Sequence, residues 1–144
     1  MALDGGGGGG GGPLGFANSF TGPAEALEVT QDHAYAYSGT QGINTSPVTA
    51  LSFTSGNFYL VGRIYCNGGV TAGSSAGSLS VFDISFNGTS IGLLRTRTAA
   101  DDSPDTVYND IIIPPYTEVQ VTITSGGTDA AILTSVNITG RIYR

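Results

Sequence analysis

Few residues of this 144-residue chain have side chains that catalysis or metal binding requires. There is one Cys, Cys66, and one His, His33, and lysine is absent. One Cys forms no internal disulfide, and together with one His it cannot complete a structural zinc site. The acidic neighbour of His33, Asp32, should point to the opposite face of a strand and so leave the imidazole without a catalytic partner. We therefore interpret His33 as a polar strand residue and expect no catalytic residues, no cofactor and no enzymatic activity.

Three aspartates close together could bind Ca²⁺, which prefers hard oxygen ligands. Asp101, Asp102 and Asp105 lie in the segment AADDSPD. The segment lacks the ligand spacing of an EF-hand loop and its glycine. We favour a solvated loop between two strands over a calcium site, and so expect no metal.

Two further side-chain types have more than one interpretation. Arg95 and Arg97 are two residues apart, so both project from one face of a strand. They could hold a carboxylate of a neighbouring subunit or ligand, or form an exposed pair that balances Asp101 and Asp102. Cys66 falls on the apolar side of its strand without a positive neighbour in sequence, which favours a small buried hydrophobe over a reactive thiol.

The charge balance excludes several classes of partner. Eleven carboxylates stand against five basic residues, for a formal net charge of −6. Binding along nucleic acid needs clustered Lys or Arg, so we expect no nucleic-acid partner. No apolar run approaches the roughly 18 residues of a membrane span. The N-terminus also lacks the basic and apolar regions of a signal peptide, and we expect no membrane partner.

From residue 27 onward, the hydrophobic pattern predicts strands. In residues 57–66, one face carries Phe58, Leu60, Ile64 and Cys66, and the other carries Tyr59, Val61, Arg63 and Tyr65. Strands are also expected at 27–37, 48–55, 78–86, 89–98, 106–113, 116–125 and 131–143. Asn87-Gly88 joins two of them with the dipeptide favoured in a type I′ hairpin. About eight short strands predict an all-β jelly-roll sandwich over residues 27–144.

The second face of the 57–66 strand is a candidate binding surface. Tyr59, Arg63 and Tyr65 are residue types that are enriched where proteins meet, and Val61 lies among them. Contact with another chain is one interpretation. Burial of both faces inside a large sandwich is the other, and both stay open at this point.

Residues 1–26 differ in composition and predict an extended N-terminal arm. Glycine occupies every position from 5 to 12, and ordering such a backbone costs on the order of 1–2 kcal/mol per residue. A glycine backbone can, however, thread a groove that has no room for Cβ atoms, and 26 extended residues reach roughly 85 Å. We expect a partner to order the arm, with contacts from Gly5, Gly8, Gly12, Leu14, Phe16 and Phe20.

Three segments resemble small jelly-roll structural proteins of marine tailed phages. They are GFANSFTGPAEALEVTQDHAYAYSG, NFYLVGRIYCNGG and IIIPPYTEVQVTITSGG…SVNITGRIYR. The last two strands, with the alternating EVQVTI and with Gly140 near the end, also look like trimeric tumour-necrosis-factor-like jelly rolls. The resemblance implies a virion component that is often trimeric, that has no catalytic residues and that binds through an extended arm.

The leading hypothesis is a capsid decoration (cement) protein on the exterior of a virion. We expect it to be made in the host cytoplasm, to form a homotrimer and to bind the major capsid protein or other virion subunits through its arm. The alternative is the receptor- or glycan-binding head of a phage fibre, which would use the tyrosine-bearing surface or residues 101–105. A minor or major capsid subunit is a third, weaker possibility.

Overall fold

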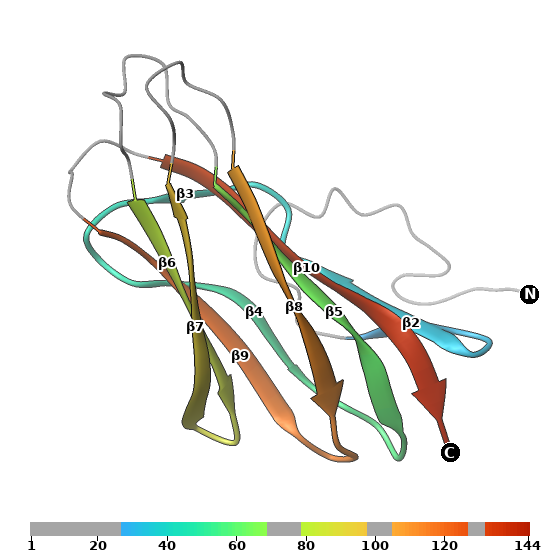
Figure 1. Ribbon diagram of the computed structural model, residues 1–144. Coiled ribbons are helices and arrows are strands. Elements are labelled where there is room, and N and C mark those ends of the chain that lie inside the picture. The colour runs from blue at the N-terminus through green and yellow to red at the C-terminus, as the bar shows by residue number, and fades with distance from the viewer. Residues whose placement is uncertain (1–26, 69–78, 98–104, 127–131) are drawn as a thin grey trace, which may run out of the picture.

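Two antiparallel β-sheets face each other in the computed structural model, which describes residues 27–68, 79–97, 105–126 and 132–144 (Figure 1). The first sheet has the order β1 (Glu28–Thr30), β2 (His33–Tyr37), β10 (Ile132–Tyr143), β5 (Tyr59–Gly68) and β8 (Asp105–Ile113), and β3 (Gln41–Ile43) also pairs with β10. The second has the order β4 (Val48–Thr54), β9 (Glu118–Ser125), β6 (Leu79–Phe86) and β7 (Thr89–Arg97). The predicted arm, residues 1–26, lies outside the described residues.

The winding of the chain is that of a jelly roll. From β3 onward, consecutive strands alternate between the two sheets, with the exception of β6 and β7, which follow each other within the second sheet. If β2 and β3 count as one interrupted strand beside β10, two four-stranded sheets remain, with β1 as an addition at one edge. The expected sandwich of about eight strands is therefore confirmed.

The core lies between the sheets and follows the predicted alternation. Leu60, Ile64 and Cys66 on β5 are fully buried. The inward residues of the other long strands are buried with them, and include Phe82, Ile84, Val119, Val121, Ile123, Ile132, Val136, Ile138 and Ile142. Burial of these side chains against the opposite sheet supplies the main driving force for folding.

The single strand expected over 27–37 is instead a hairpin of β1 and β2. Gln31 has a φ of 56°, which reverses the chain so that Thr30 pairs with His33. Asp32 therefore lies in the turn, and its carbonyl accepts a hydrogen bond from the Ile142 amide at 2.9 Å. The prediction that Asp32 and His33 point to opposite faces is wrong, because it assumed an uninterrupted strand: His33 Nδ1 lies 2.6 Å from Asp32 Oδ1.

The Asn87-Gly88 turn has the predicted backbone. Asn87 and Gly88 have φ values of 49° and 81°, and positive φ at both central residues is what a type I′ turn requires. The Asn87 side chain adds a link to the neighbouring strand, since its Oδ1 accepts a hydrogen bond from the Glu118 amide at 2.9 Å.

Two glycines let β5 and β10 approach each other at the middle of the first sheet. Gly62 pairs with Gly140. A Cβ atom on Gly62 would lie 2.0 Å from the Thr139 carbonyl oxygen, and one on Gly140 would lie 2.6 Å from the Val61 carbonyl oxygen. Both contacts are to backbone, which cannot rotate away, so these positions exclude any larger residue without a shift of the strands.

Candidate protein interface

The outer face of the first sheet gathers most of the tyrosines of the protein. Six of the seven lie there, on β2, β5, β8 and β10: Tyr35, Tyr37, Tyr59, Tyr65, Tyr108 and Tyr143. The seventh, Tyr116, lies in the turn between β8 and β9. We call this surface, together with Val61, Arg63, Asp110 and Ile112, the tyrosine face.

Strand register aligns these residues in rows across the sheet. Tyr65 lies between Tyr108 on β8 and Asn137 on β10, and the next row places Arg63 between Asp110 and Thr139. Residues that pair directly in an antiparallel sheet point to the same side, so each row continues the face from one strand to the next. The predicted contact residues Tyr59, Arg63 and Tyr65 are thus the β5 portion of a surface that spans four strands.

The tyrosine face is open to solvent in the single chain. Tyr59 is 51% exposed, Tyr108 57% and Ile112 59%. Val61 is also exposed, so the sandwich does not bury this side of β5. Of the two interpretations that the sequence left open, burial of both faces within the sandwich does not apply to these residues.

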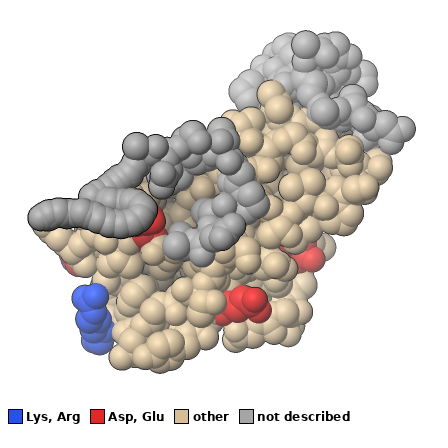
Figure 2. All heavy atoms as spheres, turned by 180° about the vertical axis from the view of Figure 1, so that it is seen from behind, with Lys and Arg blue, Asp and Glu red and all other residues tan. Residues whose placement is uncertain are grey.

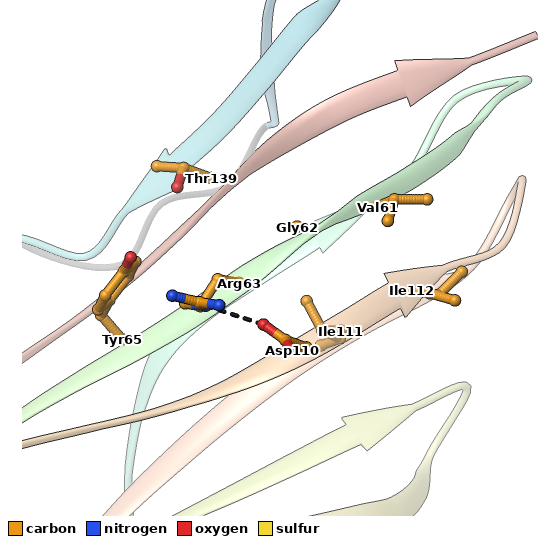
Figure 3. Close-up of a pocket in the computed structure, with 8 residues that line it drawn as sticks. All are labelled: Val61, Gly62, Arg63, Tyr65, Asp110, Ile111, Ile112 and Thr139. Carbon is orange, nitrogen blue, oxygen red and sulfur yellow. Dashed lines mark hydrogen bonds and ion pairs between the residues drawn. The ribbon is translucent and has the colours of Figure 1, made fainter.

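The positive charge of Arg63 is paired on the face itself. Its Nε donates a hydrogen bond to Asp110 Oδ1 at 2.8 Å, and its guanidinium carbon lies 4.5 Å from the centre of the Tyr108 ring. The Asp110 hydrogen bond raises the pKa of Arg63 above its ordinary value. Figure 3 shows the guanidinium lying between Tyr65 and Asp110. Arg63 therefore serves as a planar, charge-paired surface beside two aromatic rings, which are 5.8 Å apart.

A shallow pocket of about 570 Å³ opens on this face. Val61 and Ile112 line its apolar side, and Arg63, Tyr65 and Asp110 line its polar side (Figure 3). The remaining lining residues are Gly62, Ile111 and Thr139. A pocket with an apolar surface next to paired charges suits a bound ligand ring, or a side chain of a partner, that has both apolar and polar edges.

A second charge pair lies at the edge of the face, at the β1–β2 turn. Arg141 Nη2 donates to Asp32 Oδ2 at 2.6 Å, while the other carboxylate oxygen contacts His33. The hydrogen bond from Arg141 is the main cause that lowers the pKa of Asp32 below its usual value. The Asp32 carboxylate thus pairs with both Arg141 and His33 and links the hairpin to β10.

The other candidate residues lie apart from this face. Cys66 is buried in the core, and burial raises its pKa to about 12, as expected for an unreactive thiol. Arg95 and Arg97 are exposed on β7, in the second sheet. Asp105 Oδ2 accepts a hydrogen bond from the Arg97 amide at 2.9 Å. Asp101 and Asp102 lie outside the described residues, as do Gly5, Gly8, Gly12, Leu14, Phe16 and Phe20.

Sequence reasoning found only the β5 part of the face. Tyr35, Tyr37, Tyr108 and Tyr143 were missed as contact residues because their position beside Tyr59 and Tyr65 depends on which strands pair. The available signal was alternation: each tyrosine lies on the side of its strand that the apolar core residues leave free.

The described part of the chain contains neither a cluster of metal ligands nor a helix that could span a membrane. Among the described residues, no three His, Cys, Asp or Glu side chains come together as a metal site. None of the described residues belongs to a helix with the length and apolarity of a membrane span. Figure 2 shows one side of the molecule, where uncharged residues make up most of the described surface and charged side chains are scattered.

Comparisons with known proteins identify no family. No family model matches the chain, and no curated protein matches it. Similar solved structures include dimeric latent PorU from Porphyromonas gingivalis, at 15% identity and a TM-score of 0.44, over 82% of this chain and 13% of that one. Another is the infectious bursal disease virus Gx strain, at 17% identity and a TM-score of 0.34, over 82% and 30%. The chain spans less than a third of either protein, and likenesses this weak carry no conclusion about function.

Proposed function

We propose that this protein is a non-enzymatic structural component of a virion, a capsid decoration protein that works by holding on to other protein chains. The observation that carries the proposal is the tyrosine face. It is a broad, exposed surface of aromatic and branched aliphatic side chains with paired charges, supported by a rigid sheet of a jelly roll. Aromatic residues and arginine are enriched, and Asp and Glu depleted, where proteins bind each other.

In this proposal the two regions of the chain have different tasks. The jelly roll of residues 27–144 is the folded body on the exterior of the shell. The arm of residues 1–26 binds the major capsid protein or other virion subunits, with its glycines against narrow backbone grooves and Phe16 and Phe20 in pockets. The net charge of −6 suits an outward position, since it disfavours adhesion to nucleic acid.

Removal of residues 1–12 tests this role of the arm. We expect the truncated chain to bind shells assembled from the major capsid protein of the same virus at least tenfold more weakly than the full chain, in a co-sedimentation assay. Its circular dichroism spectrum and melting temperature should stay unchanged, because the deleted residues precede the sandwich. A matched variant with Ser at Gly5, Gly8 and Gly12 keeps the length of the arm and should also bind more weakly. Full affinity of the truncated chain would contradict the proposal.

A glycan-binding fibre head is the second candidate, and the pocket on the tyrosine face favours it. Arg63 and Asp110 there could bind sugar hydroxyls while Tyr65 contacts the ring. A glycan-array signal that is lost in the Asp110→Asn variant and kept in Asp83→Asn, on the other sheet, would support this function. An array without any signal would speak against it.

A further inference from the structure

We infer that the tyrosine face binds a second copy of this chain, so that the protein assembles with itself through the outer surface of β2, β10, β5 and β8. The inference rests on the proposed role of this face as a protein interface, but it does not depend on the virion assignment. It names the occupant of the face, which composition by itself leaves open.

The charged side chains on the face balance one another. Across these four strands, the outward charged side chains of the described residues are Arg63, Asp110 and Arg141. Arg63 is paired with Asp110, and Arg141 with Asp32 in the adjoining turn. The two arginines and the two aspartates cancel, so these four strands and the turn contribute no net charge when His33 is neutral. Glu28 on β1, which pairs with Tyr35, adds one negative charge at the edge of the sheet.

The negative charge of the rest of the molecule bears on which partner can bind this face. With a net charge of −6, two copies repel each other over most of their surfaces. A positively charged partner would bind best to unpaired carboxylates, but on these four strands and the adjoining turn the carboxylates of Asp110 and Asp32 are already paired. A neutral face is where two acidic copies can meet without placing like charges together.

The chemistry and size of the surface also suit contact with a second copy. Tyr59, Tyr108 and Tyr143 expose more than half of their area, and Ile112 exposes 59%. Four strands about 4.8 Å apart and seven residues at about 3.4 Å give a patch of roughly 19 by 24 Å in projection. The projected ~450 Å² is more than half of the ~800 Å² that each partner contributes to a standard interface. Solvent exposure of so large an aromatic patch is costly for a free monomer, and a second copy covers it.

Ile112→Glu, with Leu93→Glu as its control, tests the inference. Both residues are exposed aliphatics on edge strands, 59% on β8 and 55% on β7, but they lie on opposite sheets. Analytical ultracentrifugation of the full chain should give an oligomer, heavier than the 14.6 kDa single chain. Ile112→Glu should weaken the assembly at least tenfold because it places an unpaired carboxylate within the contact, whereas Leu93→Glu should leave the mass unchanged.

A second pair of variants removes aromatic surface without adding charge. Tyr108→Ser should also weaken assembly, and Tyr116→Ser, in the β8–β9 turn, should not, although Tyr116 is the more exposed of the two at 67%. Circular dichroism confirms that each variant is folded before its mass is interpreted.

The outcomes separate this inference from the proposed function. A wild-type chain that stays monomeric at high micromolar concentration overturns self-assembly, and so does an oligomer that both Ile112→Glu and Tyr108→Ser leave intact. If the monomeric chain binds shells and Ile112→Glu abolishes that binding, the face docks on the shell and only the choice of partner is wrong. If the chain forms the oligomer but does not bind shells, self-assembly stands and the decoration role falls.

Discussion

At the scale of single residues, Cys66 shows how burial decides the chemistry of a side chain. Its thiol has no accessible surface and packs in the core between the sheets, and burial raises its pKa from 9.0 to about 12. A thiol is nucleophilic only as the thiolate. We therefore expect an aromatic disulfide reagent at pH 8 to label the folded protein at least a hundredfold more slowly than the urea-unfolded chain. Rapid labelling of the folded protein would show that the core opens locally.

The same group links stability to pH. Because the pKa of Cys66 is raised in the folded state, its contribution is fully present below pH 9 and is lost as pH rises toward 12. The free energy of unfolding should fall by up to about 1.4 kcal/mol per pH unit in this range. Urea unfolding of wild type and Cys66→Ala at several pH values measures this slope, and the variant should lack the part due to the thiol. Equal slopes would mean that the thiolate is tolerated where it lies.

At the scale of elements, the pairing of β5 with β10 depends on the two facing glycines. Gly62→Ala would bring a Cβ atom to within 2.0 Å of the Thr139 carbonyl oxygen, so the strands must move apart. We expect a loss of about 1–3 kcal/mol in the free energy of unfolding. Gly92→Ala on β7 is the matched control, since a Cβ atom there meets nothing within 4 Å. Equal urea midpoints for the two variants would contradict this account.

Elements were predictable from sequence where alternation and turn chemistry agreed. Val119, Val121 and Ile123 alternate with polar residues, and Asn87-Gly88 favours a turn that needs positive φ, so these faces and this hairpin followed directly. The β1–β2 turn was missed because Gln31, at a φ of 56°, is not a residue that signals the left-handed region. Its conformation follows from contacts of Asp32 with β10, 109 residues further along the chain. The full tyrosine face was missed for a similar reason, because it is assembled by long-range pairing of strands.

At the scale of the whole molecule, the distribution of tyrosines provides a built-in reporter of assembly. The chain has no Trp, so its ultraviolet emission comes from seven tyrosines, six of them on the tyrosine face. If copies meet through this face, quenching of that emission by acrylamide should decrease as concentration rises through the assembly range. Ile112→Glu should show no such change. An increase in mass without any change in quenching would assign the contact to another surface.

The position of β10 in the first sheet has a consequence for the order in which the protein folds and assembles. This strand, Ile132–Tyr143, lies between β2 and β5 and joins them. Before β10 pairs, the β1–β2 hairpin and β3 have no strand that connects them to β5, and the tyrosines of β2 cannot align with those of β5. Completion of the first sheet therefore depends on pairing between strands far apart in the sequence, which is slow compared with local pairing. A chain in which β10 has not yet paired consequently lacks a complete tyrosine face, and copies recognise one another through this face only after that step.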